Sequence, residues 1–182
     1  MKAVRGRGYT LIELLIAIAL MSMVAALAIP VIAAQNAQKL DLAASEVAAA
    51  LNFARSEALR TGQYYGVRIG SADSHVRVFL LNRSPLPPTE VYNVLHPVDK
   101  KIYDIALSSA AFSSGVSVSQ SAFLYSPQPA SEAVAFDPEG RPLLLTNAGA
   151  RALLVSGSAT VSRQGDSRTI SVERETGRVR IS

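Results

Sequence analysis

The sequence predicts an α+β protein in which one long N-terminal helix packs on an antiparallel β-sheet or sandwich domain. Two observations predict this fold. Residues 9–34 form an apolar run that is interrupted only by Thr10, Glu13, Ser22 and Pro30. After residue 62, short runs of alternating apolar and polar residues are separated by Gly, Pro, Ser and Asn, with no sign of crossover helices.

Composition limits the class of protein. The 182 residues carry a formal net charge of +4, but 49% of them are hydrophobic and only 18% are charged. This composition excludes a disordered basic tail and suits one domain of ordinary size with a real core. The chain has no Cys, which excludes a disulfide-stapled scaffold, thiolate metal sites and Cys nucleophiles.

The apolar run has the length and the flanks of a membrane-spanning helix. No charged residue lies between Glu13 and Lys39, and about 20 apolar residues are enough to cross a bilayer. Lys2, Arg5 and Arg7 precede the run. Positively charged flanks stay in the cytoplasm, so we expect a single span with the remainder of the chain outside the cytoplasm.

Glu13 separates three interpretations of this segment. A secretory signal peptide has an apolar core of about 7–15 residues, which is shorter than this run and carries no carboxylate. A plain signal anchor fits the length but gives no reason for Glu13. An acidic residue at the centre of a membrane helix costs about 2.5–3.5 kcal/mol, and less near the end of the span, so the carboxylate indicates a function.

The third interpretation rests on residues 8–13, which read Gly-Tyr-Thr-Leu-Ile-Glu. They resemble the prepilin processing motif of type IV pilins and type II secretion pseudopilins. The resemblance implies that residues 1–8 are a leader, that a prepilin peptidase cuts between Gly8 and Tyr9, and that the new N-terminus at Tyr9 is methylated. Most of the family has Phe where this chain has Tyr9. The resemblance also implies that Glu13 pairs with the N-terminal ammonium of a neighbouring subunit and sets the axial register of a filament, because a buried carboxylate needs a charged partner.

The helix is expected to continue past the apolar run as an amphipathic segment, residues 35–62. Apolar residues recur there at helical spacing, at Leu40, Val47, Leu51, Ala54 and Ala58. Gly62 provides a C-cap. Pro30 interrupts the helix, and two interpretations of it stay open. In pilins a proline at the corresponding point lets the helix bend or melt in the filament; otherwise Pro30 is simply a boundary between two helices.

Residues 63–182 form the expected β-domain. Its candidate strands are 64–69, 75–81, 101–107, 116–125, 133–136, 152–155, 160–163, 168–173 and 178–181. Residues 84–88 are expected to form an extended loop, and residues 136–140, Phe-Asp-Pro-Glu-Gly, a turn. This Phe-x-Pro-x-Gly element and the helix end at residues 53–62 resemble the FimT/GspH group of minor pilins and pseudopilins.

The sequence contains no catalytic constellation. His75 and His96 are the only histidines, and neither belongs to a Glu-x-x-His helix motif. There is no Gly-x-Ser-x-Gly elbow and no P-loop. We therefore expect no enzyme activity, no metal site and no cofactor.

The charge is unevenly distributed. Loss of the leader would leave 15 basic against 14 acidic side chains, whereas residues 151–182 alone hold six Arg against three acids. Turns at residues 164–167 and 175–177 are expected to bring five arginines close together: Arg163, Arg168, Arg174, Arg178 and Arg180. Strand alternation is expected to place Arg178 and Arg180 on one face while Val179 and Ile181 point to the core.

Residues 177–180, Gly-Arg-Val-Arg, match the Gly-Arg-x-Arg pattern with which FimT-like minor pilins contact DNA during natural transformation. The resemblance implies double-stranded DNA binding by Gly177, Arg178 and Arg180, with the other three arginines in support. Guanidinium groups suit phosphate because they offer fixed paired donors. The alternative is a hairpin that closes the sheet of a secretion pseudopilin, with Glu173 paired to Arg178 across the strands.

Two functions are therefore expected. One is a DNA-capturing subunit of a type IV pilus; the other is a structural pseudopilin of a type II secretion system that binds no DNA. Both imply an inner-membrane protein with a periplasmic C-terminal domain, built into a periplasmic or surface filament. The implied partners are the prepilin peptidase, other pilins or pseudopilins, the inner-membrane assembly platform and, for the pilus subunit, DNA.

Overall fold

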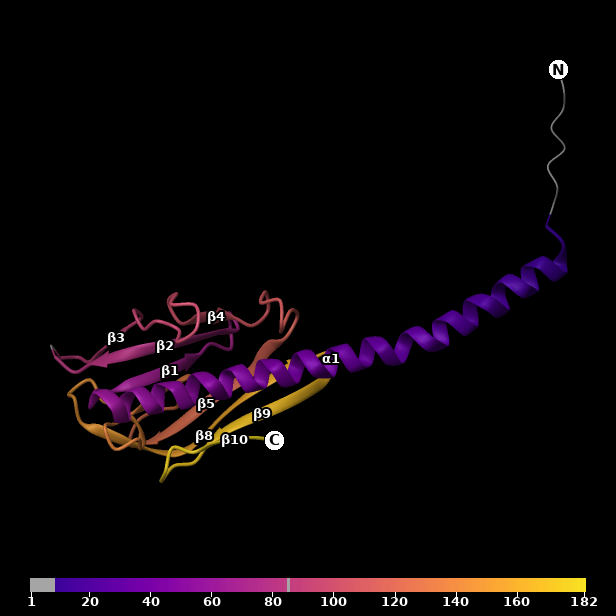
Figure 1. The fold of residues 1–182 in the computed structure, drawn as a ribbon. Coiled ribbons are helices and arrows are strands. Elements are labelled where there is room, and N and C mark those ends of the chain that lie inside the picture. Colours follow the sequence, from indigo (N-terminus) through magenta and orange to yellow (C-terminus); the bar gives the residue numbers. More distant parts are fainter. Residues whose placement is uncertain (1–8, 85) are drawn as a thin grey trace, which may run out of the picture. The chain divides into compact units, whose positions relative to one another are not determined.

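The structure, a computed structural model, describes residues 9–84 and 86–182, and only the backbone of residues 25–34. Two compact units, Met1–Ala37 and Gln38–Ser182, divide the chain. The expected leader, including Gly8 and the three basic residues before it, lies outside the described residues. One long helix and ten strands make up the described chain (Figure 1).

A single helix, α1 (Leu11–Thr61), runs from the apolar segment into the larger unit. It continues through Pro30, so Pro30 is not a boundary between two helices in this structure. A proline inside a helix removes one hydrogen bond, and long helical segments on both sides can absorb that loss. The helix ends at Thr61, and Gly62 after it has a φ of 69° and donates its N–H to the Ala58 carbonyl at 3.0 Å, as the C-cap prediction requires.

The expected membrane span falls in the first unit. Among the helical residues whose side chains the structure describes, no stretch combines the length and apolarity that crossing a bilayer requires. Residues 25–34 are outside that comparison, because their side chains are not described.

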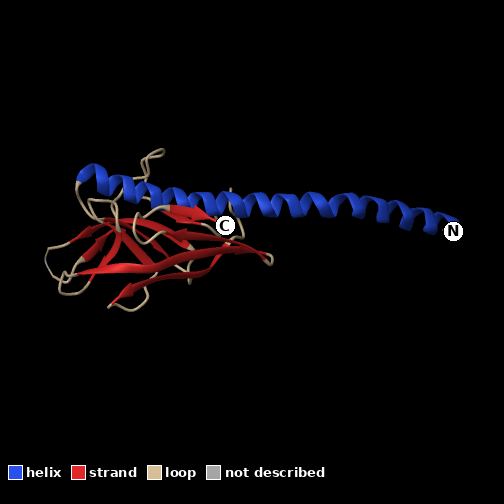
Figure 2. Cartoon of the chain, turned by 90° about the horizontal axis from the view of Figure 1, so that it is seen from below, coloured by secondary structure: helices blue, strands red, loops and turns tan. Residues whose placement is uncertain are grey.

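Ten strands follow the helix. They are β1 (Tyr65–Ile69), β2 (His75–Asn82), β3 (Thr89–Val91), β4 (Asp104–Ala106), β5 (Ser117–Ser126), β6 (Ala133–Phe136), β7 (Pro142–Leu145), β8 (Arg151–Arg163), β9 (Asp166–Val172) and β10 (Val179–Ile181). Every pairing is antiparallel, in the order β10-β9-β8-β7-β6-β1-β2-β3, with β4 on β2 and β5 on β8. The predicted α+β class, a long helix on an antiparallel sheet, is confirmed (Figure 2).

The long strand β8 joins the two ends of this sheet. Its first residues pair with β7, its later residues pair with β9 along the same edge, and β5 follows its other edge. The sequence predicts two separate strands here, 152–155 and 160–163, but the structure has one. Ser156, Gly157 and Ser158 have weak intrinsic strand preference, so pairing on both edges decides their conformation.

Other strand bounds also differ from the prediction. The expected strand 101–107 shrinks to β4, because residues 101–103 form only an isolated bridge, between Ile102 and Leu95, and a turn begins at Leu107. Strands β3 and β7 were not predicted from the sequence. Leu143 and Leu145 of β7 are buried while Leu144 is half-buried, so this short Pro-Leu-Leu-Leu run shows no apolar–polar alternation.

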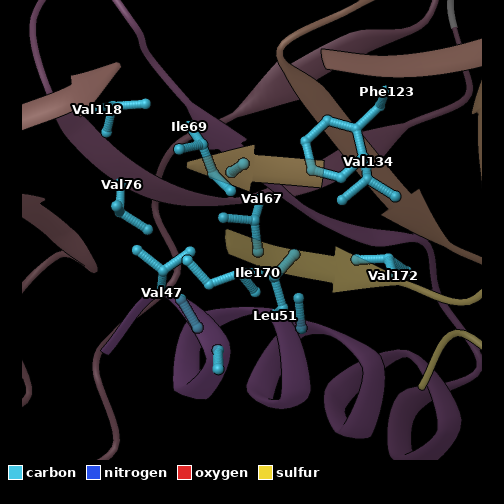
Figure 3. Close-up of a cluster of buried hydrophobic side chains, with 14 of the residues drawn as sticks. Val47, Leu51, Val67, Ile69, Val76, Val118, Phe123, Val134, Ile170 and Val172 are labelled. Atoms are coloured by element: carbon cyan, nitrogen blue, oxygen red, sulfur yellow. The ribbon is translucent and has the colours of Figure 1, made fainter. Parts of the chain in front are cut away.

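The core lies between the sheet and the second part of α1. Leu40, Val47, Leu51, Ala54 and Ala58, which the helical spacing identifies as one face, are all fully buried. Figure 3 shows Val47 and Leu51 pointing from the helix toward strand side chains that include Val67, Val76 and Ile170. A smaller cluster, built around Phe79 and Leu143, covers the opposite face of the sheet at β1, β2, β6 and β7. The helix therefore covers one face of the sheet.

Candidate functional site

The C-terminal hairpin carries the arginine motif. Strand β10 pairs only with β9, with Arg180 opposite Ser171. At the turn, the Glu173 N–H donates to the Arg178 carbonyl and the Gly177 N–H donates to the Glu173 carbonyl, both at 2.9 Å. The Thr176 hydroxyl donates to the Glu173 carboxylate at 2.8 Å. These bonds hold the backbone of the motif in place.

Arg178 and Arg180 are exposed, and with Ser171, Val172 and Glu173 they line a shallow hollow of about 190 Å³. Neither guanidinium forms an ion pair within the described part of the chain. The ion pair expected between Glu173 and Arg178 is not formed, because the Glu173 carboxylate turns to the Thr176 hydroxyl. Both positive charges are therefore available to an outside anion.

The expected gathering of five arginines is wrong. Arg168 donates to Asp41 of α1 at 2.8 Å, and Arg174 pairs with its neighbour Glu175 at 3.0 Å. Arg163 lies opposite Asp166 at the β8–β9 turn, the far end of the hairpin from Arg178. The seven residues of β9 separate these two ends by roughly 20 Å.

One hydrophobic residue of the motif also departs from the prediction. Val179 is half-buried and packs against the core, as strand alternation requires. Ile181, however, is 45% exposed. Because β10 has a neighbouring strand on one edge only, its last side chain has little cover.

Gly177 plays a positioning role, because it is buried and cannot reach a ligand. Its φ is 66°, in the left-handed region that favours glycine. A Cβ at this position would lie 2.5 Å from the Gly140 carbonyl oxygen and 3.0 Å from the Phe136 ring. The two glycine-containing turns, 136–140 and 173–177, are therefore packed against each other, a contact that the sequence analysis missed.

Asp137 organises the first of these turns. Its side chain is 2% exposed. One carboxylate oxygen accepts the backbone N–H groups of Glu139 at 3.0 Å and Arg141 at 2.8 Å. The other oxygen lies 3.6 Å from guanidinium nitrogens of both Arg141 and Arg151. The Asp-Pro-x-Gly pattern predicts the turn, but Arg151 comes from another strand and is brought there only by the fold.

Glu13 takes part in a capping box at the start of α1. The Thr10 backbone N–H donates to the Glu13 carboxylate at 2.9 Å, and the Glu13 N–H donates to the Thr10 hydroxyl at 3.3 Å. Tyr9, the expected new N-terminus, is 89% exposed. The sequence analysis did not consider this role for Glu13, although the Thr-x-x-Glu spacing is a signal for it.

Family models match most of the chain. Residues 43–177 match the family described as type II transport protein GspH, and residues 5–29 match the prokaryotic N-terminal methylation motif. The chain belongs to the GspH family. It is therefore a minor pilin or pseudopilin, a class of structural filament subunits rather than of known enzymes.

Solved structures of two such proteins are similar to this GspH-family chain, and the first of them shows the fold. The minor pseudopilin EpsH of the Vibrio cholerae type 2 secretion system is 16% identical over 79% of this chain and 96% of its own, with a TM-score of 0.51. The type IV minor pilin FimU of Pseudomonas aeruginosa is 17% identical over 79% of this chain and 87% of its own, with a TM-score of 0.44. A comparison with curated protein sequences gives no match.

The extent of the GspH match matters for the arginine motif. The match includes Asp137, Gly140 and Gly177 but ends one residue before Arg178. The two packed turns therefore lie within the matched residues, and Arg178 and Arg180 lie just beyond them.

The two histidines of this GspH-family chain have partners that account for them. His75 Nδ1 lies 2.6 Å from Asp104, and the His96 ring stacks edge-on against Tyr103 at 4.5 Å. Burial and the nearby Glu46 carboxylate raise the pKa of Tyr103. Within the described ranges, no three His, Asp or Glu side chains are arranged to hold a metal ion.

Proposed function

We propose that the protein is made as a prepilin and cut between Gly8 and Tyr9, where the new N-terminus is methylated. Residues 9–34 then anchor it in the inner membrane and later form the filament core, with residues 35–62 and 63–182 in the periplasm. The methylation motif at residues 5–29 and the GspH match support this proposal. Its partners are the prepilin peptidase, the inner-membrane assembly platform and other pilins or pseudopilins.

We assign Glu13 an intersubunit role in assembly. The capping box holds its carboxylate in the first turn of α1, close to the N-terminus that cleavage at Tyr9 would create. In this proposal the ammonium of a neighbouring subunit replaces or joins the Thr10 donors. Pro30 is a second assembly position, where α1 lacks one backbone donor and can bend in the filament.

Two variants distinguish assembly from helix capping. Glu13→Val removes both the carboxylate charge and the capping box, and we expect it to stay in the membrane but be absent from filaments. Thr10→Ala weakens the capping box and leaves the charge, and we expect near-normal incorporation. The measurement is immunoblotting of the sheared filament and membrane fractions. If Thr10→Ala were excluded as completely as Glu13→Val, helix capping would explain the effect and the pairing role would be wrong.

We further propose that Arg178 and Arg180 contact the phosphates of double-stranded DNA, as a pilus subunit for DNA uptake would. The observation that carries this proposal is that both guanidiniums are exposed and have no acidic partner in the described residues, while Arg168 and Arg174 both have one. Contacts to phosphate are largely independent of base sequence and weaken as salt rises.

The second candidate, a structural pseudopilin of a type II secretion system that binds no DNA, is supported equally by the family description and by the EpsH-like fold. The two candidates differ in one measurable property, the affinity for a DNA duplex. Residues 38–182 are suitable for this test because they form a compact unit, and every buried hydrophobic residue in the described chain lies at or after Leu40.

The test titrates this fragment with a short duplex of mixed sequence at salt concentrations between about 50 and 200 mM. Replacing Arg178 and Arg180 together by Ala should make the negative slope of log K against log salt less steep by about 1.8, since each phosphate contact contributes about 0.9. Replacing the ion-paired Arg168 and Arg174 by Ala removes the same charge and should change the slope much less. An absence of binding at the lowest salt, or equal effects of the two double variants, would leave the secretion pseudopilin as the function.

A further inference from the structure

The packed turns place a second group of arginines beside the C-terminal motif. Gly140 and Gly177 touch, since a Cβ on Gly177 would lie 2.5 Å from the Gly140 carbonyl oxygen. Arg141 and Arg178 are the residues that follow these two glycines. Two segments that are 37 positions apart in the chain therefore bring their arginines to the same end of the sheet.

Asp137 joins Arg141 to a third arginine. Its buried carboxylate lies 3.6 Å from both Arg141 and Arg151. These distances exceed those of hydrogen bonds, and the carboxylate is already bound by two backbone N–H groups. The two guanidiniums, 55% and 48% exposed, thus keep N–H donors for an outside acceptor.

Tyr64 extends the group to a fourth arginine. Its hydroxyl accepts a hydrogen bond from Arg151 at 2.7 Å. The exposed Arg83 lies over its ring, 5.0 Å from the centroid, which is within the range of a cation–π contact. Arg83 follows the end of β2, so a third part of the chain contributes to the same region.

Contacts therefore connect one row of residues that begins at Arg83 and continues through Tyr64, Arg151 and Asp137. The backbone contact between Gly140 and Gly177 extends this row to Arg178. We call the five cations of this row the arginine arc: Arg83, Arg151, Arg141, Arg178 and Arg180. The acids in or beside it are Asp137, which is buried, Glu139, which lies 3.7 Å from Arg141, and Glu173. Five cations against three carboxylates leave the arc positive.

We propose that the arginine arc forms one continuous phosphate-binding track, so that duplex DNA runs from the C-terminal hairpin over the Asp137 turn to Arg83. This inference rests on the proposed DNA contact of Arg178 and Arg180 and extends it to three arginines outside the Gly-Arg-x-Arg motif. Five guanidiniums offer paired donors to successive phosphates, and Asp137 and Tyr64 hold Arg141 and Arg151 in place.

The size of the effect follows from the number of phosphates. Five phosphate contacts predict a slope of log K against log salt of about −4.5, which is a loss of roughly 500-fold in DNA affinity between about 50 and 200 mM salt. The motif alone, with two contacts, predicts a slope of about −1.8 and a loss of only about 12-fold. The salt dependence of the unmodified protein therefore already separates the two cases.

The decisive experiment compares double variants of residues 38–182 with the unmodified fragment, by duplex DNA titration at several salt concentrations. Arg83→Gln with Arg141→Gln should make the negative slope of log K against log salt less steep by about 1.8. This variant leaves Arg151, which contacts Tyr64 and Asp137, unchanged. Arg77→Gln with Lys101→Gln is the charge-matched control. Arg77 lies on β2 six residues before Arg83, roughly 20 Å away, and Lys101 is close to the β4 strand that pairs with that end of β2.

Each outcome has one meaning. A reduced slope for the Arg83/Arg141 variant, with the control unchanged, supports the arc. If the Arg178/Arg180 variant loses affinity but the Arg83/Arg141 variant behaves like the control, the arc is wrong and the proposed DNA contact stands. If the unmodified fragment fails to bind DNA at low salt, both fail. Thermal melting of each variant, and the single change Arg83→Gln at an exposed position, separate lost contacts from lost folding.

Discussion

Replacing Gly177 by Ala tests the contact on which the position of the arginine motif depends. The added Cβ would lie 2.5 Å from a backbone oxygen, that of Gly140, and 3.0 Å from the Phe136 ring. Neither neighbour is the end of a flexible side chain, because the Phe136 ring is fully buried. The hairpin must therefore move away from the turn at residues 136–140.

The magnitude has two parts. A non-glycine residue at a φ of 66° costs about 1–2 kcal/mol. Overpacking a tight contact adds about 1–3 kcal/mol. Gly62→Ala is the matched control, because its φ is nearly the same at 69° and a Cβ there would meet no atom within 4 Å. The difference between the two variants isolates the overpacking.

The assay is thermal unfolding of residues 38–182 followed by circular dichroism. We expect Gly177→Ala to lower Tm by roughly 3–12 °C more than Gly62→Ala, at about 3–4 °C for each kcal/mol in a domain of this size. DNA affinity should fall as well, although no charge is removed, because Arg178 is displaced. Equal Tm values for the two variants would show that the two turns are not tightly packed, and the reasoning about the motif would fail.

Three further predictions concern stability. Asp137→Ala should lower the free energy of unfolding by about 2–3 kcal/mol in urea titrations, because two backbone N–H groups lose the buried carboxylate that accepts their hydrogen bonds; a loss below about 0.5 kcal/mol would contradict this. Phe123→Ala should cost about 3–5 kcal/mol by the same assay, since Phe123 is fully buried, whereas exposed Leu124→Ala should cost far less. Burial raises the pKa of Tyr103 and Tyr125, so above about pH 10 the native protein keeps protons that the unfolded chain loses. The free energy of unfolding in urea titrations should therefore fall as the pH rises above about 10, and unchanged stability there would refute this.

Much of the fold could be predicted from local pattern. The helical spacing of Leu40, Val47 and Leu51 identifies the face that is buried, and Gly62 identifies the end of α1. The bounds of β1, β2 and β6 are predicted to within one residue. These patterns predict the structure correctly because the residues that form each pattern lie close together along one helix or strand.

The prediction fails where distant segments decide the structure. Strand β8 contains a Ser-Gly-Ser stretch that forms a strand because β5 and β9 pair with it on both edges. The short strand β7 has no alternation to reveal it. The five C-terminal arginines are close in sequence, yet β9 places Arg163 and Arg168 at the opposite end of the hairpin from Arg178.

The sequence by itself determined the processing motif at residues 8–13, the long helix with its buried face, and the likeness to the FimT/GspH group, because each depends on residues near one another in the chain. Only the tertiary structure decided which arginines share a surface. It separates Arg168 from Arg180 by binding Arg168 to Asp41, and it brings Arg141 to Arg178 through the Gly140–Gly177 contact. That contact joins turns far apart in sequence, and its free energy comes from packing that exists only once the sheet has formed.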